Sequence, residues 1–218
     1  MTAPNLVSIV VSEYLAPALR ADGWRRTGAS FRWLNDAGDQ AVIGMRRRQS
    51  PEPDTGSFYV DVALWTEAYI DLSRAAKDLG TNPHAERGIF TAHIRQPDTG
   101  LQWWDVTSDT VASCGQQLVD VVAREVAPAM IELLDRDKLL SLRRSNTKPP
   151  GPQWQAFDPI GVMLAFLVDD GPSEEVEELV RRTQKYAEGP LVEAWVRQRL
   201  ASRTIEGMGG TRREASTD

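Results

Sequence analysis

Charged and aromatic side chains alternate with apolar ones in the β-rich runs of the first half of the sequence. In the run SFYVDVALW, at positions 57–65, Tyr59, Asp61 and Trp65 alternate with the apolar residues at the even positions. Successive side chains of a strand point to opposite faces, so the apolar set predicts the packed face of a sheet. The same parity on neighbouring runs predicts an exposed ligand-binding surface on the other face, composed of Arg32, Arg46, Arg48, Tyr59, Asp61, His93 and Arg95.

These residue types together are suited to binding an anion or a planar ring. Guanidinium groups donate paired hydrogen bonds to carboxylates or phosphates, and they stack on aromatic faces. His93 is the candidate for proton transfer near neutral pH, Asp61 is the carboxylate that would orient it, and Arg46 or Arg48 would bind the anion. A sheet with one face in water also carries polar residues there without any function. The sequence leaves both interpretations open.

The sequence contains no metal-binding or nucleotide-binding motif of known spacing. His84 and His93 are nine residues apart and Cys114 is the single cysteine, so no HExxH or CxxC zinc site is present. No Walker loop, G-x-S-x-G turn or G-x-G-x-x-G after a strand occurs. We therefore predict no metal ion and no cofactor, assign no catalytic residue, and expect Cys114 to pack as a small hydrophobic residue.

Charge and composition restrict the classes of partner. The 218 residues carry a net charge of −6, with 41% hydrophobic and 26% charged residues, as is usual for globular domains. An acidic chain does not suit general nucleic-acid binding, which needs a basic stripe. One segment, Arg20–Arg48, has seven arginines against three aspartates and could attract an anion. The first positive side chain is Arg20 and the longest apolar stretch is Pro159–Val168, so we expect a cytoplasmic protein without membrane contact.

The first half of the chain shows patterns of both helix and strand. Apolar spacing predicts a helix over Leu6–Leu19, which Pro17 should kink or restart. Three β-runs follow, and the turn sequences NDAG and PEPDTG between them are typical of an antiparallel meander. We also predict a hairpin from Gly88–Arg95 and Leu101–Val106, and a short helix over Asp71–Leu79.

The second half of the chain is predicted to be helical. An apolar stripe indicates a helix that begins with Asp109 as its N-cap and ends near Arg143. Pro128 would clash with the carbonyl of Arg124, so we expect either a kink or two consecutive helices with Pro128 in the first turn of the second. After the aperiodic SNTKPPGPQWQ, three further helices are predicted: one near Asp158–Val168, one after Ser173 and one from Pro190.

These patterns predict an α+β fold, in which an antiparallel β-meander is packed on one face by helices and is followed by a C-terminal helical annex. The expected organisation is an α+β core at 1–144, a Pro/Gly-rich linker at 145–157, the helical annex at 158–203 and a flexible tail at 204–218.

The segment GWRRTGASFRW has a motif that mixes turn glycines with aromatic and basic residues: Gly23-Trp24, Arg25-Arg26, Gly28 and Phe31-Arg32. Together with the two β-runs after it, this segment resembles a bacterial family of domains of unknown function, whose members typically show Gly-Phe, a basic run, Gly and Phe-Tyr-Arg here. The sequence departs from that pattern at Trp24 and at Trp33. The resemblance covers roughly residues 5–143 and implies an α+β domain; the family has no assigned reaction or catalytic residues.

Two functions from different classes are consistent with the sequence. The first is a non-enzymatic intracellular binding domain with a protein partner, by analogy with the small α+β proteins that neutralise bacterial toxins, a toxin-immunity-like role. The second is a protein or enzyme that binds a small anionic ligand on the sheet face bearing the arginines and His93. Whether the chain is an enzyme is left open at this point.

Overall fold

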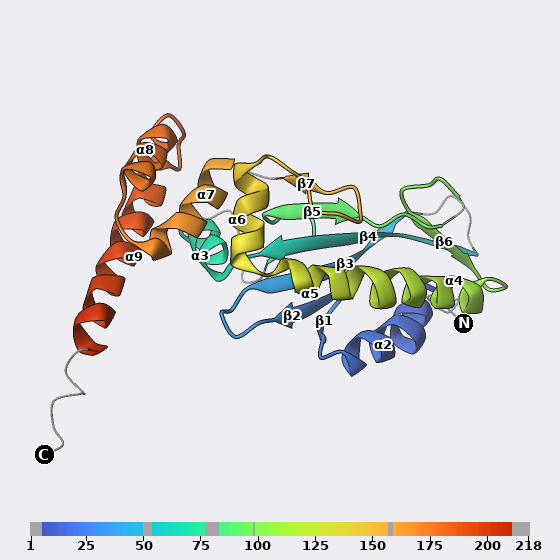
Figure 1. The fold of residues 1–218 in the computed structure, drawn as a ribbon. Coiled ribbons are helices and arrows are strands. Elements are labelled where there is room, and N and C mark those ends of the chain that lie inside the picture. Colours follow the sequence, from blue (N-terminus) through green and yellow to red (C-terminus); the bar gives the residue numbers. More distant parts are fainter. Residues whose placement is uncertain (1–5, 50–53, 77–82, 98, 157–158, 211–218) are drawn as a thin grey trace, which may run out of the picture. The chain divides into compact units, whose positions relative to one another are not determined.

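The computed structural model of the chain describes residues 6–49, 54–76, 83–97, 99–156 and 159–210 (Figure 1). It has the predicted α+β fold, with an open antiparallel sheet and helices. The chain divides into two compact units: unit 1 comprises Met1–Glu67 and Pro83–Phe157, and unit 2 comprises Ala68–Asn82 and Asp158–Asp218. The segment Ala68–Asn82 therefore groups with the C-terminal helices, which its position in the sequence does not indicate.

The sheet of unit 1 begins with the predicted meander. Its first four strands pair in chain order, each antiparallel to the next: β1 (Arg25–Thr27), β2 (Ser30–Leu34), β3 (Gln40–Arg48) and β4 (Thr55–Trp65). The remaining strands are β5 (Phe90–His93), β6 (Trp104–Thr107) and β7 (Gln155–Ala156). The order of the described strands is β1-β2-β3-β4-β5-β7, with β6 also paired to β4.

The predicted hairpin between Gly88–Arg95 and Leu101–Val106 is wrong. β5 and β6 both pair with β4, β5 at Asp61–Leu64 and β6 at Thr55–Phe58. Because β4 has 11 residues, one of its edges holds both short strands end to end. The indole Nε1 of Trp104 donates a hydrogen bond of 2.8 Å to the carbonyl of Ile94 and links the two short strands. β7 lies in the segment 145–157 predicted as a linker, and Trp154 beside it is buried.

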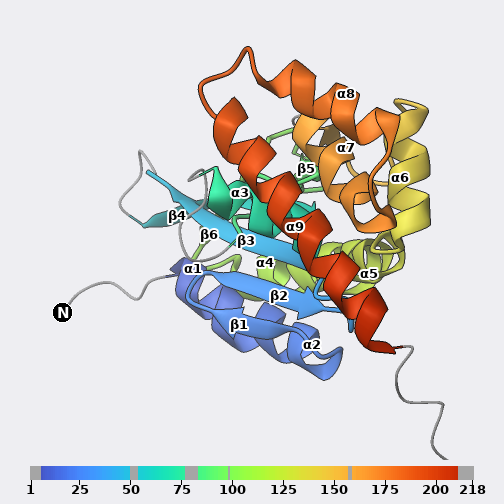
Figure 2. The same ribbon diagram turned by 90° about the vertical axis from the view of Figure 1, so that its left-hand side faces the viewer.

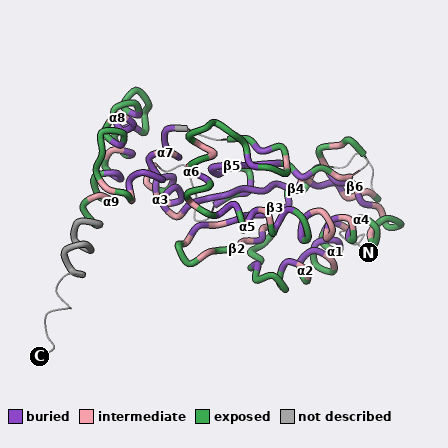
Figure 3. The backbone as a smooth tube through the Cα atoms, viewed as in Figure 1, coloured by how far each residue is buried: buried purple, intermediate pink, exposed green. Residues whose placement is uncertain are grey.

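The even positions of β4 form the packed face, as the alternation predicts. Phe58, Val60, Val62 and Leu64 are fully buried, and β3 and β4 are buried along most of their length (Figure 3). Helix α1 (Leu6–Ile9) lies on this face, because the side chain of Val7 lies against Gly56 of β4. Helix α4 (Val111–Leu118) contacts β6 of the sheet and also η1 (Val10–Leu15), where the ring of Tyr14 lies against Gly115.

Pro17 and Pro128, the two prolines that interrupt the predicted helices, each follow a wide helical turn. The π-helices η1 and η2 (Val119–Val126) are followed by the α-helices α2 (Ala16–Ala21) and α5 (Ala127–Leu133), each with proline in its first turn. The amides of Ala16 and Ala127 donate to carbonyls five residues back. A proline ring would clash with the carbonyl four residues back, and the wider turn displaces that carbonyl. Consecutive helices with Pro128 in the first turn of the second are therefore confirmed.

The predicted N-cap at Asp109 is wrong. α4 begins at Val111 with Thr110 as its N-cap residue, and no side chain caps it. The hydroxyl of Thr110 instead accepts a hydrogen bond of 2.8 Å from the amide of Thr107 at the end of β6. The apolar stripe that was predicted to run from Asp109 to about Arg143 ends in α6 (Arg136–Arg144). The side chain of Asp135 caps this helix by accepting a hydrogen bond from the amide of Lys138.

Unit 2 is helical in its described part. It contains α3 (Glu67–Ala75, from Ala68 onward), α7 (Pro159–Leu167), the 3-10 helix η3 (Val168–Asp170), α8 (Glu174–Thr183) and α9 (Gly189–Gly210). α8 packs against both α7 and α9 (Figure 2). α3 begins four residues before the predicted Asp71. Residues 204–210 of the predicted tail continue α9, and residues 211–218 lie outside the described part.

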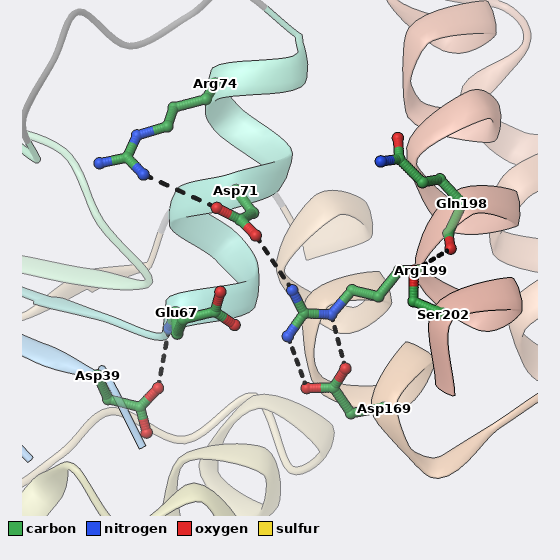
Figure 4. A network of polar contacts seen from close by, with 8 residues as sticks. All are labelled: Asp39, Glu67, Asp71, Arg74, Asp169, Gln198, Arg199 and Ser202. Atoms are coloured by element: carbon green, nitrogen blue, oxygen red, sulfur yellow. Dashed lines mark hydrogen bonds and ion pairs between the residues drawn. The ribbon is translucent and has the colours of Figure 1, made fainter. Parts of the chain in front are cut away.

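Arg199 of α9 connects three elements of unit 2 (Figure 4). Its Nε and Nη2 donate to the two carboxylate oxygens of Asp169 at 2.6 and 3.1 Å, and Nη1 donates to Asp71 of α3 at 3.3 Å. Asp169 is only 5% exposed and Arg199 17% exposed. A bidentate pair out of water is among the stronger charge-assisted contacts, so this contact holds α9 to η3 and α3.

Candidate functional site

Strand register brings most of the predicted surface residues to one face of the sheet. Arg46 pairs with Tyr59, and Asp61 pairs with both Gly44 and His93. Residues in register lie on the same face, as do residues two apart on one strand. The parity prediction is thereby confirmed for Arg32, Arg46, Arg48, Tyr59, Asp61 and His93. Arg95 lies two residues beyond the end of β5 and outside the strand.

The expectation that this face lies open at the surface is wrong for its central part. Asp61, Ala63 and Trp65 are no more than 2% exposed. The segment at residues 83–89 covers them: Ala85 lies against Gly44, and Gly88 contacts Ala63. The indole Nε1 of Trp65 donates to the carbonyl of His84 at 3.1 Å. Gly44 has no side chain, and this absence makes room for the covering segment.

Arg46 is held by acidic and aromatic partners within unit 1. Its Nε lies 3.4 Å from Oδ2 of Asp61 and also contacts the carboxylate of Glu86. Its guanidinium carbon lies 4.4 Å from the centre of the Tyr59 ring. Two carboxylates thus already neutralise the group that the sequence suggested as an anion clamp.

The other three arginines also have contacts inside the protein. Arg48 stacks over the indole of Trp103 at 4.0 Å. Arg32 donates from Nη2 to the carbonyl of Pro83 at 2.9 Å, and burial lowers its pKa from the ordinary value. Arg95 donates from Nη2 to Oε1 of Gln153 at 3.2 Å. Arg32 and Arg48 therefore hold the covering segment and a neighbouring indole in place.

Asp61 joins Arg46 to His93. Its Oδ1 accepts a hydrogen bond from Nδ1 of His93, and its Oδ2 accepts from Arg46. The Asp61 side chain is 2% exposed and the His93 side chain 43% exposed. A carboxylate only accepts hydrogen bonds, so Asp61 favours the neutral His93 tautomer that carries its proton on Nδ1. In that tautomer Nε2 is a hydrogen-bond acceptor. A buried carboxylate thus fixes an accessible imidazole, as the sequence predicts for these two residues.

The imidazole of His93 lines a pocket of about 370 Å³ in unit 1. The other polar side chains on its wall are Arg95, Glu125 of η2 and Gln153. Val121 and Val126 of η2 and Ala129 of α5 supply apolar surface.

The pocket lies at an edge of the sheet. β7 pairs only with Phe90 and Thr91 of β5, so on the edge of β5 that faces away from β4 the chain from His93 onward has no described strand beside it. The sequence did not reveal Glu125 or Gln153 as wall residues. Both are distant from His93 in the sequence and line the same pocket only in the folded chain, and neither belongs to a motif of fixed spacing.

Two other chemistries find little support in the described residues. Burial, reinforced by the negative charge of Asp105, raises the pKa of Cys114 to about 11. A thiol in that state is a poor nucleophile at neutral pH. No group of three or more His, Cys, Asp or Glu side chains that could hold a metal ion is found where side chains are described.

Comparison with models of known protein families, with curated proteins and with solved structures finds no match for this chain. The resemblance based on GWRRTGASFRW therefore stays a prediction. Among the helices of the described segments, none combines the length and the apolar character that crossing a membrane requires.

Proposed function

We propose that this protein binds a small organic anion in the pocket beside His93. The observation that carries the proposal is the fixed imidazole: Asp61, 2% exposed, holds Nδ1 of His93 while the same ring lines the pocket. Maintaining a buried carboxylate costs free energy unless it is paired. The pair with His93 offsets that cost and leaves the ring oriented for a ligand.

The pocket walls supply both of the contact types that a small-molecule site needs. Its volume of about 370 Å³ falls in the usual range of ligand pockets, which join apolar walls to a few oriented polar groups. Arg95 supplies a guanidinium that lies opposite no described carboxylate, and the imidazole of His93 lies on the same wall. Val121 and Val126 would contact the apolar part of the ligand.

The wall composition favours binding over covalent catalysis. None of the described wall residues is serine, threonine, cysteine or lysine, so a covalent step could run only through the carboxylate of Glu125 or the imidazole of His93. A carboxylate that orients an imidazole is also the arrangement of a general base. His93 is accordingly the residue through which any proton transfer to the ligand would run.

A thermal-shift screen with carboxylated and phosphorylated metabolites tests this proposal. Compounds that bind the folded state raise the unfolding temperature in proportion to their occupancy. We expect at least one compound to stabilise the wild type and the His84→Gln variant equally and to have little effect on His93→Gln. His84 is the matched control because it is the other histidine and does not line the pocket. A shift that is the same in His93→Gln, or a complete screen without any shift, would contradict the proposal.

A protein partner is the second candidate, and the edge strand β1 favours it. β1 is the terminal strand in the order of the described sheet, and its three residues, including Arg25 and Arg26, are exposed. Leu34, at the end of β2, is 48% exposed. An acidic extended segment of a partner could pair with such an edge. Affinity purification from the source cell should then yield a stoichiometric partner, lost on Arg25→Glu/Arg26→Glu substitution; a partner-free monomer would count against this function.

A further inference from the structure

We infer that the ligand of the His93 pocket is zwitterionic, a small aminocarboxylate whose ammonium group contacts Glu125 and whose carboxylate contacts Arg95. This inference rests on the proposed function, since it specifies the ligand of the same pocket. The observation behind it is that the pocket wall holds one carboxylate and one guanidinium that do not form an ion pair with each other.

Glu125 supplies the negative charge. Its side chain lines the pocket from η2, and no hydrogen bond or ion pair to it is found within the described residues. Its neighbour Arg124 is engaged elsewhere, because it donates to Asp120 at 2.5 Å. The basic group nearest in sequence is therefore occupied, and the carboxylate of Glu125 is available to a ligand cation.

Arg95 supplies the positive charge. Its only hydrogen bond or ion pair among the described residues is the hydrogen bond to the neutral amide oxygen of Gln153. Arg95 and Glu125 line the same pocket without forming an ion pair there. Gln153 leaves most of the five guanidinium donors free for a carboxylate.

Complementarity between these walls and a ligand then sets the ligand class. A simple carboxylate would pair with Arg95 and place its apolar end near Glu125. An aminocarboxylate would pair both charges and keep its carbon chain against Val121 and Val126. Each pair is partly exposed, so its contribution is modest; we expect removal of the ammonium group to weaken binding about three- to fivefold.

Matched compounds test the inference on the full chain. Calorimetric titrations would compare leucine, 4-aminobutanoate and 6-aminohexanoate with their deaminated partners 4-methylpentanoate, butanoate and hexanoate. At least one zwitterion should bind about three- to fivefold more tightly than its partner. Glu125→Gln should remove that difference and leave the affinity for the deaminated acid unchanged, whereas Arg95→Gln should weaken both. Glu13→Gln, an exposed carboxylate of η1 outside the pocket, is the matched control and should change nothing.

The outcomes separate this inference from the proposed function. If the deaminated acids bind as tightly as the zwitterions, or if Glu125→Gln leaves their ratio unchanged, the zwitterionic ligand is excluded while anion binding stands. If none of the six compounds binds at millimolar concentration, the aminocarboxylate inference fails, and a blank metabolite screen would then remove the proposed function as well.

Discussion

Asp61 and His93 are register partners on β4 and β5, and the carboxylate of the first accepts the Nδ1 hydrogen bond of the second. The same carboxylate accepts from Arg46, so one buried group joins two partly exposed ones. This arrangement fixes the imidazole at the pocket without any contribution from a loop side chain. The orientation of His93 is therefore a property of the sheet itself.

The first prediction concerns Asp61→Asn. The change removes the charge that both His93 and Arg46 pair with, at a site with almost no access to water. We expect the free energy of unfolding to fall by about 1 to 3 kcal/mol, measured by urea denaturation. Asp36→Asn, at an exposed position in the β2–β3 turn, is the control and should be neutral. Equal stability of the two variants would show that the Asp61 contacts do not hold the sheet face together.

The second prediction concerns Arg199→Met in unit 2. The substitution removes the bidentate partner of Asp169, which is 5% exposed, and should destabilise the protein by about 3 kcal/mol. Arg197→Met on the same helix is the matched control. Arg197 also has a bidentate carboxylate partner, Glu177, but both side chains are half exposed, so its loss should have little effect. If both variants lose the same free energy of unfolding, burial of the Arg199–Asp169 pair does not determine how much that pair stabilises the protein.

The third prediction is a pH dependence at Asp39. Its Oδ1 accepts a hydrogen bond of 2.8 Å from the amide of Glu67, the first residue of α3. Burial raises the pKa of Asp39 despite this bond and the one from Asn35. A carboxyl with a raised folded pKa binds protons more tightly when folded, so its contribution to stability is present at low pH and is lost as the pH rises through that pKa.

Asp39→Asn keeps an oxygen acceptor for Glu67 and cannot ionise. The stability of the wild type relative to Asp39→Asn should therefore decrease between about pH 3 and pH 7, as followed by urea unfolding at each pH. A wild type that gains stability over the variant across this range would show that the pKa shift has the opposite sign. Asp36→Asn again serves as the control, because its side chain is exposed.

The fourth prediction concerns the thiol of Cys114. The side chain is buried, and its pKa of about 11 leaves little thiolate at neutral pH. We expect the folded protein to react very slowly with iodoacetamide and to react rapidly after unfolding in guanidinium chloride. Because the chain has one cysteine, mass spectrometry gives this rate without assignment. Rapid labelling of the folded protein would contradict the packed position of Cys114 in α4.

The alternation of residue types in the sequence predicted which side chains share a face of the sheet, but not which segment covers that face. The alternation in SFYVDVALW is a property of neighbouring residues, so it placed Asp61 and the buried even positions correctly. The cover over Asp61 comes from residues 83–89, which have no periodic pattern. The false hairpin has a similar cause: turn residues between two β-runs do not show that each run pairs with a third, longer strand.

The candidate site was predictable only in part for the same reason. Asp61 and His93 carry chemistry that the sequence reveals, and strand parity brings them to one face. In the sequence, Glu125 cannot be distinguished from the other polar residues of an amphipathic helix, and Gln153 belongs to an irregular segment. Both join the site because η2 and residues 151–153 approach the open edge of β5.

The most direct test of the account is a nuclear magnetic resonance titration that follows the two histidine rings while a carboxylated compound from the thermal-shift screen is added. Long-range proton–nitrogen spectra of the neutral protein should show His93 with its proton on Nδ1, and the compound should shift the His93 signals while those of His84 stay in place. A His93 ring protonated on Nε2 alone, or equal shifts at both histidines, would contradict a fixed imidazole at the binding pocket.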